Sequence, residues 1–275
     1  MHVCRFSHAT LDDPRLGLVD DGEVTTIEIE TGTLDGALAN HDWASIRAAA
    51  TGRTVDAADA TLLAPVERPT NLIGVGLNYV GHAAEGGFDV PEEPVFFAKS
   101  PSSITAPDGP VYSHDGVTDL HYEGEFGFVV GETARRVDRA DALDHVFGFL
   151  AGNDVTARDM QLRDMDATNP WFRSKSMDTF TPLGPYVTPV GEGVDPASTW
   201  IETRLNGEMV QSSNTDDLVF GVPELVAYIS QHVTLNPGDV VLTGTPAGVG
   251  SMHPGDEVAV EVEGVGVLHN EVNAP

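Results

Sequence analysis

The segment LHYEGEFGFVVG, residues 120–131, places two carboxylates inside what reads as a β-strand. Its other residues are mostly apolar or aromatic, and Gly131 ends the run. Side chains alternate between the two faces of a strand, so Glu123 and Glu125 are predicted to point the same way, roughly 7 Å apart. Glutamate is uncommon in strands, and like charges on one face repel each other. The fold must either expose this pair to water on an edge strand or neutralise it.

A hard divalent cation between the two glutamates would turn repulsion into attraction, because carboxylate oxygens suit Mg²⁺, Mn²⁺ and Ca²⁺. A third acidic ligand is then expected at the end of another strand, and Asp154 closes the apolar run FGFLAGND. His121 offers a different ligand set, since His121, Glu123 and Glu125 alternate onto one predicted face. A histidine and a carboxylate are two thirds of a non-haem iron triad, so an iron dioxygenase is the rival interpretation.

The chain is strongly acidic, with 43 acidic residues against 14 basic ones and a formal net charge of −29. Lys99 and Lys175 are its only lysines. A surface of this charge repels itself in dilute buffer, whereas molar salt, with a Debye length of about 3 Å, screens the repulsion. We therefore expect a cytoplasmic protein of a halophile, without a nucleic-acid partner, because phosphate would be repelled. No signal peptide or run of ~20 apolar residues indicates a membrane partner.

Two regions of different residue pattern meet near Pro65. Residues 1–65 are predicted to form a small N-terminal domain rich in strands, with a hairpin in LGLVDDGEVTTIEI around Asp-Gly turn residues. Short helices are expected between residues 34 and 60. Residues 66–275 are predicted to form a larger domain of short apolar strands separated by Gly, Pro and Asp.

Helices are predicted to be few in this larger domain. One is expected over TARDMQL, after Asp154, and another over VPELVAYISQHV, where Pro223 suits a first turn. The second has an apolar face made of Leu225, Val226, Ile229 and Val233. The fold class is therefore mainly β with some α, an α+β arrangement without regular βαβ units.

Common cofactor motifs are incomplete in this chain. GVGLNY lacks the third glycine of a dinucleotide fingerprint, and GTPAGVG lacks the Gly-Lys-Ser/Thr of a phosphate-binding loop. The single cysteine, Cys4, excludes an intrachain disulfide and a paired-cysteine zinc site.

Several ordered segments together resemble the fumarylacetoacetate hydrolase family over about residues 70–272. They are IGVGLNYVGHAAE, PVFFAKSPSSITAPDGPV, LHYEGEFGFVVG, GNDVTARDMQ, RSKSMDTFTPLGPYV and LNPGDVVLTGTPAGVG. The resemblance implies a mixed β-roll catalytic domain, a homodimer, and a divalent metal held by Glu123, Glu125 and Asp154. The likeness is to the acylpyruvase and 2-hydroxyhepta-2,4-diene-1,7-dioate isomerase branch. Val75 and Gly76 stand where the true hydrolases carry a further acid, so the resemblance implies three protein ligands, with water and substrate in the other positions.

The same resemblance places other residues at the site. Lys175, in RSKSMDTF, is implied to contact substrate and stabilise negative charge, whereas Lys99 is expected to be structural or near the entrance. In GHAAE, His82 and Glu85 are neighbours on one helical turn, so Glu85 can orient His82 as the base that activates water. Glycine and proline on both sides of that turn predict a mobile lid.

Two further side chains are expected to line the pocket. Thr245, in TGTPAG, is predicted to bind the substrate carboxylate through its hydroxyl and backbone N–H, with a plain turn as the alternative. Gln161 lies one turn beyond Arg158 in TARDMQ.

The expected function is metal-dependent chemistry on a 2-oxo acid through an enolate. Hydrolytic C–C cleavage of an acylpyruvate, decarboxylation of a β-keto diacid and isomerisation of a 2-hydroxydienedioate share that enolate, so the motifs leave all three open. An iron dioxygenase using His121 and an inactive structural paralogue are the alternatives from other classes.

Overall fold

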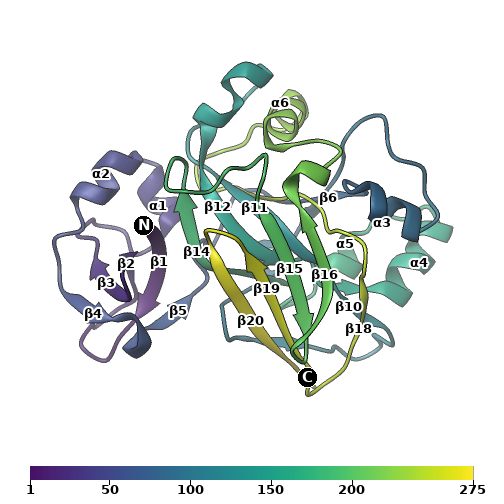
Figure 1. The fold of residues 1–275 in the computed structure, drawn as a ribbon, viewed down its shortest axis with the longest axis horizontal. Helices are drawn as coiled ribbons and strands as arrows, with labels where there is room; N and C mark the ends of the chain where they lie inside the picture. The colour runs from purple at the N-terminus through teal and green to yellow at the C-terminus, as the bar shows by residue number, and fades with distance from the viewer. Residues whose placement is uncertain (275) are drawn as a thin grey trace.

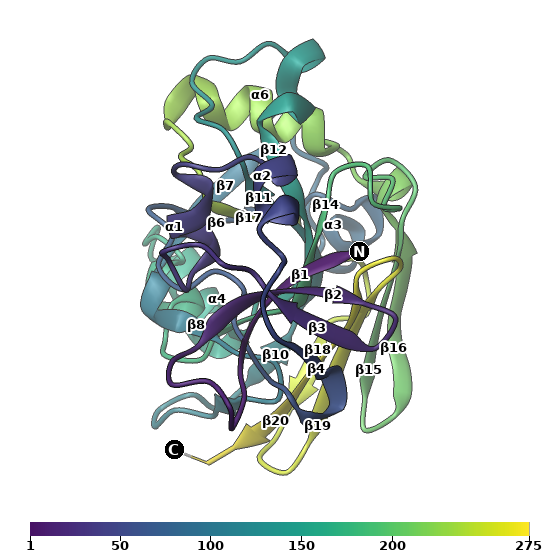
Figure 2. The same ribbon diagram turned by 90° about the vertical axis from the view of Figure 1, so that its left-hand side faces the viewer.

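The computed structural model describes residues 1–274, and its N-terminal part is a small sheet with two short helices (Figures 1 and 2). The strands are β1 His2–Ser7, β2 Arg15–Asp20, β3 Glu23–Thr26, β4 Thr54–Asp56 and β5 Thr61–Leu63. The helices are α1 Leu34–Leu38 and α2 Trp43–Ala48. The predicted hairpin is confirmed as β2–β3. Its turn residues Asp21 and Gly22 both have positive φ, 46° and 81°, as a two-residue hairpin with the twist of its strands requires.

A 12-stranded sheet forms the spine of the described chain. Its main path runs β4-β3-β2-β1-β14-β12-β11-β17-β6-β7. Because β1 pairs with β14 at Val3 and Val187, the N-terminal strands continue into the larger sheet. The remaining members are β6 Leu72–Gly76, β7 Val95–Lys99, β8 Ile104–Thr105, β11 Gly124–Val130, β12 Val146–Asn153, β14 Thr181–Pro189 and β17 Val240–Leu242.

A second, five-stranded sheet packs against β11 and β12 and closes the core (Figure 1). It consists of β9 Pro110–Tyr112, β15 Trp200–Leu205, β16 Glu208–Asn214, β19 Glu257–Val262 and β20 Gly266–Asn273. In β19, Val258, Val260 and Val262 are buried while Glu257 and Glu261 face water, so the period of two explains which face joins the core. A three-stranded sheet of β10 Leu120–Tyr122, β13 Thr156–Ala157 and β18 Gly250–Met252 completes the fold.

The helices of the larger domain are α3 Val80–Glu85, α4 Arg158–Asp166, α5 Phe172–Lys175 and α6 Val222–His232. Helix α6 confirms the sequence prediction, since it has Pro223 in its first turn and buries Leu225, Val226 and Ile229. Helix α4 begins two residues later than predicted, because Thr156 and Ala157 pair with β10. It also ends four residues later than predicted. The expected α+β class is confirmed. Among residues 1–274, no helix is long and apolar enough to cross a membrane.

Candidate active site

The two glutamates do not share one strand, which corrects the sequence prediction. Strand β10 ends at Tyr122 and β11 starts at Gly124, and these strands belong to different sheets. Glu123 lies at the break, where its N–H donates to Asn153 Oδ1 at 2.9 Å and its carbonyl accepts from Asp154 N at 2.8 Å. A side chain at Gly124 would place Cβ 2.0 Å from Thr203 Oγ1, so the chain can pass there only as glycine.

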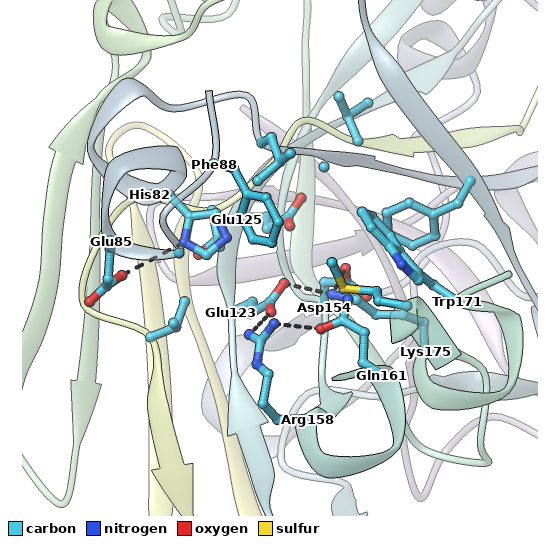
Figure 3. A pocket seen from close by; sticks show the side chains of 18 of the residues that line it. His82, Glu85, Phe88, Glu123, Glu125, Asp154, Arg158, Gln161, Trp171 and Lys175 are labelled. Atoms are coloured by element: carbon cyan, nitrogen blue, oxygen red, sulfur yellow. Dashed lines mark hydrogen bonds and ion pairs between the residues drawn. The ribbon is translucent and has the colours of Figure 1, made fainter. Parts of the chain in front are cut away.

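Although the two glutamates lie on different segments, three carboxylates meet in one cavity (Figure 3). Oxygen atoms of Glu123, Glu125 and Asp154 lie within 4.8 Å of one another. The side chains are 4%, 1% and 1% exposed, respectively, so the edge-strand alternative is wrong. Asp154 directly follows β12, as its position after an apolar run predicts.

Three basic side chains neutralise these carboxylates. Lys175 Nζ lies 2.7 Å from Glu123 Oε2 and 2.6 Å from Asp154 Oδ2. Arg158 donates to Glu123, and Lys99 donates to Asp154. The pair of glutamates is therefore tolerated because three basic side chains reach it from β7, α4 and α5.

The pKa values of the cluster follow from burial and these contacts. Burial pushes the pKa of Glu123 upward, but Lys175 and Arg158 hold it well below its usual value. Burial, followed by the charges of Asp154 and Glu123, raises the pKa of Glu125 well above its usual value. Burial lowers the pKa of Lys175, but Asp154 and Glu123 outweigh it and keep that pKa raised. Without a further positive charge beside it, Glu125 therefore favours its protonated form.

Lys99 is a structural residue deep behind the cluster, which supports the structural alternative over a place near the entrance. It is 2% exposed, and its ammonium also donates to the Lys175 and Phe180 carbonyls, at 2.5 and 3.2 Å. Burial lowers the pKa of Lys99, although the charge of Asp154 opposes that shift. Lys99 therefore fixes both Asp154 and the backbone that carries Lys175.

His82 and Glu85 line the same cavity from α3, as expected. His82 Nδ1 lies 3.7 Å from Glu85 Oε2, beyond hydrogen-bond distance, so the carboxylate acts on the imidazole through its charge. Burial lowers the pKa of His82, with Glu123 opposing it, so the imidazole is neutral at neutral pH and can accept a proton.

Gln161 and Thr245 both line the cavity, and both are already hydrogen-bonded. Gln161 Oε1 accepts from Arg158 Nη1 at 2.5 Å. The Thr245 hydroxyl donates to Gly124 O at 2.9 Å and accepts from Gln211 Nε2 at 2.8 Å. The single hydroxyl proton is therefore used within the protein, which leaves the backbone N–H of Thr245 as the better donor for a substrate carboxylate.

His121 lies outside the group of ligand atoms, which contradicts the iron-triad interpretation. Its Nε2 is 3.0 Å from Asp119 Oδ1, and its Nδ1 faces Arg158 Nε at 3.4 Å. The end of β10 before Glu123 interrupts the strand alternation that placed His121 on the same face as the two glutamates. Among the described residues, the atoms close enough to share an ion come from the three carboxylates.

Gln211 and Arg158 are two supporting residues that the sequence analysis did not assign. Gln211 accepts from Gly124 N at 3.0 Å and donates to Pro246 O at 2.8 Å, so it joins the two backbone segments that carry Glu125 and Thr245. Its position in an ordinary strand, β16, gives no local indication of this role. Arg158 follows Asp154 by four residues, and this closeness to a candidate ligand is the feature that could have indicated its contact with Glu123.

Comparison with known proteins agrees with this geometry. The family model described as "Fumarylacetoacetate (FAA) hydrolase C-terminal" matches residues 71–273. The chain belongs to the fumarylacetoacetate hydrolase family. Residues 1–65 match a second model, described as "Rv2993c-like, N-terminal". The members of this family are enzymes, and they include hydrolases, isomerases and tautomerases.

Proteins similar to this chain are named for several different activities. The human mitochondrial oxaloacetate tautomerase FAHD2A is 42% identical over 221 residues, which cover 78% of this chain and 70% of that protein. The 5-carboxymethyl-2-hydroxymuconate delta-isomerase of Mycobacterium smegmatis is 34% identical, with full coverage of both chains and a TM-score of 0.84. Maleylpyruvate hydrolase from Sphingobium sp. SYK-6, solved with manganese(II) and pyruvate, is 30% identical, with coverage of 100% of this chain and 99% of that one and a TM-score of 0.82.

Proposed function

We propose that Glu123, Glu125 and Asp154 hold one divalent cation. The donor set fits, because three buried carboxylates are hard oxygen ligands of the kind that Mg²⁺, Mn²⁺ and Ca²⁺ prefer. A dication there would favour the ionised form of Glu125, whose pKa burial and the neighbouring carboxylates otherwise raise. The manganese in the Sphingobium maleylpyruvate hydrolase structure is further support, and Mg²⁺ or Mn²⁺ is the proposed ion here.

We further propose that the reaction is proton transfer on a 2-oxo acid, that is, keto–enol tautomerisation. The observation that carries this is the charge of the buried cluster. The three ionised carboxylates balance Lys99, Lys175 and Arg158. A bound dication leaves a net charge of two positive units in a site screened from water. The enolate of a 2-oxo acid, with one carboxylate and one enolate oxygen, carries two negative charges and matches that excess.

The side chains at the cavity supply the remaining steps. When bound, the cation supplies Lewis-acid polarisation of the keto group. His82 Nε2, the ring nitrogen that does not face Glu85, takes the proton from C3. The electron pair of the broken C–H bond then forms the C2–C3 double bond, and charge moves onto the carbonyl oxygen. The Lys175 ammonium stabilises that oxygen and delivers a proton to it, which completes the enol. The backbone N–H of Thr245 orients the substrate carboxylate.

Hydrolytic cleavage of an acylpyruvate is the second candidate. The favouring observation is the His82–Glu85 pair, because a carboxylate behind an imidazole makes it a better base for water. Decarboxylation of a β-keto diacid and isomerisation of 2-hydroxyhepta-2,4-diene-1,7-dioate form the same enolate, so each is an outcome to assay beside the first two.

The test is hydrogen–deuterium exchange at C3 of pyruvate, oxaloacetate and acetylpyruvate in D₂O with Mg²⁺ or Mn²⁺, followed by NMR together with product formation. Exchange without cleavage indicates tautomerisation, and cleavage of acetylpyruvate indicates the hydrolase. Glu123→Ala is expected to abolish both, whereas Glu208→Ala, an exposed acid on β16, leaves them intact. Exchange and turnover absent from every substrate with either metal would refute the proposed function.

A further inference from the structure

One side of the catalytic cavity is an aromatic wall built by Phe97 on β7 and Trp171 before α5. The two rings are edge to face, with centroids 5.4 Å apart and planes at 68°. Both rings line the cavity, and Figure 3 shows Trp171 across from His82. Further apolar lining comes from Phe88, Leu162 and Met165. The cavity is thus charged around the carboxylates and apolar elsewhere.

The wall depends on two glycines of β6. Ile73 and Val75 point into the core, so Gly74 and Gly76 face the opposite side. A Cβ at Gly74 would lie 2.5 Å from Phe97 Cζ, and one at Gly76 would lie 2.8 Å from Trp171 Cζ3. Any side chain there would clash with the rings unless they moved. The glycines of the GVG sequence therefore leave the space that the aromatic pair fills. This packing accounts for the two glycines, so a nucleotide-binding role is not needed to explain them.

The wall begins beside the reacting end of the cavity. Lys175 Nζ lies 5.4 Å from the centroid of Phe97, close enough for a cation–π interaction. Among the described residues that line the cavity, the permanent cations are Lys175 and Arg158, and both already contact Glu123. The rings offer no cation to a second carboxylate, and burying an unpaired carboxylate against them is unfavourable. A flat, uncharged group gains stacking and apolar burial at the same place.

We propose that Phe97 and Trp171 are specificity-determining residues that bind the substituent of the 2-oxo acid and select a planar, apolar substituent over a charged one. The inference rests on the proposed function, because it assumes that the carboxylate and keto oxygen of the substrate occupy the charged end. It assigns to this chain 2-oxo acids and 2,4-dioxo acids with an aromatic or unsaturated substituent.

The test is calorimetric titration of the full-length protein, saturated with Mg²⁺, against pyruvate, phenylpyruvate and 2-oxoglutarate. Phenylpyruvate is expected to bind roughly 10–100-fold more tightly than pyruvate, and 2-oxoglutarate no more tightly than pyruvate. Trp171→Ala and Gly76→Ala should each lower the phenylpyruvate-to-pyruvate ratio at least several-fold. Trp200→Ala, at an exposed site on β15, should leave the ratio as in the wild type.

The outcomes separate this inference from the proposed function. Binding of pyruvate without any gain for phenylpyruvate, or a phenylpyruvate preference that survives both Trp171→Ala and Gly76→Ala, overturns the aromatic subsite alone. Binding of none of the three acids at saturating Mg²⁺ instead overturns the proposed function. Gly76→Ala adds a single methyl group, so it tests the wall even if loss of the indole destabilises the segment before α5.

Discussion

Glu85 accepts a hydrogen bond from the backbone N–H of Gly248, with its Oε2 atom 3.1 Å from the nitrogen. This contact fastens α3 to the loop that carries Thr245, and the same carboxylate oxygen is 3.7 Å from His82 Nδ1. Gly248 has a φ of +101°, and a Cβ there would lie 2.2 Å from Val210 O, so the loop can present this N–H only with glycine. Glu85 therefore has two separable roles, as an anchor and as the partner of His82.

Replacement of Glu85 by glutamine should separate these roles. Glutamine keeps an oxygen for the Gly248 N–H but loses the charge that faces His82. We expect unchanged thermal stability and a hydrolytic kcat lower by about tenfold, whereas His82→Ala lowers it by roughly 10²–10⁴. Decarboxylation of oxaloacetate needs no attacking water and should fall less in both variants. Steady-state rates on acetylpyruvate and oxaloacetate check this, and wild-type hydrolysis in Glu85→Gln would leave Glu85 as an anchor only.

Replacement of Glu125 by glutamine should separate metal binding from folding. Glutamine resembles the protonated acid that the metal-free site favours, so the melting temperature without metal should equal or exceed that of the wild type. A ligand that binds only the folded state raises stability by mass action, so Mn²⁺ should raise the wild-type melting temperature. We expect that rise to vanish in Glu125→Gln and to persist in Glu132→Gln, at an exposed site. A full manganese-induced rise in Glu125→Gln would remove Glu125 from the ligand set.

Replacement of Lys175 should affect the metal-free protein and catalysis in different ways. In Lys175→Met, Glu123 and Asp154 lose a shared cation, so we expect a lower melting temperature that Mg²⁺ restores. The value of kcat/KM should fall by about 10²–10³, because an ammonium no longer stabilises the enolate. Lys175→Arg is the matched control, since it keeps the charge but not the point geometry. If Lys175→Arg is fully active, charge alone explains the role of Lys175.

The sequence predicts the parts of this site that depend on local pattern. An acid after an apolar strand identified Asp154, and helical spacing paired His82 with Glu85. The break at Glu123 was not predicted, because the hydrogen bond that its N–H donates there goes to Asn153, a residue distant in the sequence. Gln211 was missed for the same reason, since its partners lie far away in the sequence.

The rarity of lysine in the sequence could have indicated where both lysines lie. In a chain that retains only two lysines, both prove to be buried against Asp154. A composition that favours acids would remove lysine from the surface first, so a retained lysine indicates a buried ionic role. The aromatic wall could not be predicted from the sequence, because Gly76 and Trp171 are far apart in the chain and meet only in the fold.

Asp164 in α4 should position Lys175 through Arg173. Its buried carboxylate accepts from Arg173 Nε at 2.8 Å and from Nη2 at 2.6 Å, and α5 carries both Arg173 and Lys175. We expect Asp164→Asn to lower kcat/KM by about tenfold or more, because small displacements of a catalytic group are costly. Metal affinity should not change. Asp166→Asn, at an exposed site on the same helix, is the control, and equal rates for the two variants would contradict the positioning role.

This ion pair also has a predictable pH dependence. The hydrogen bond from Arg173 holds the pKa of Asp164 below its usual value, despite burial. The pair therefore adds stability above the unfolded-state pKa of about 3.9, and this stability is lost as pH falls through the lower folded-state pKa. The difference in free energy of unfolding between wild type and Asp164→Asn should be constant near neutral pH and shrink below about pH 4. Urea titrations at several pH values measure it.

The net charge of −29 makes salt the last variable to test. At low ionic strength the folded chain should suffer self-repulsion that the expanded chain partly escapes. Raising salt from about 0.1 M to about 1 M shortens the Debye length from ~10 Å to ~3 Å and should remove most of that penalty. We therefore expect the melting temperature to rise steeply over this range and then to level off.

Specific cation binding by surface carboxylates would give a similar trend, so the nature of the salt decides the mechanism. Screening depends on ionic strength alone, and it predicts coincident curves for KCl, NaCl and a bulky monovalent chloride. Site binding predicts that the curves separate, with the bulky cation least effective. Each titration should be run with saturating Mg²⁺, because loss of the ion at the carboxylate cluster would otherwise add its own salt dependence. A melting temperature that is flat or falls between about 0.1 and 2 M in every salt would contradict adaptation to high salt, and the excess charge would then need another explanation.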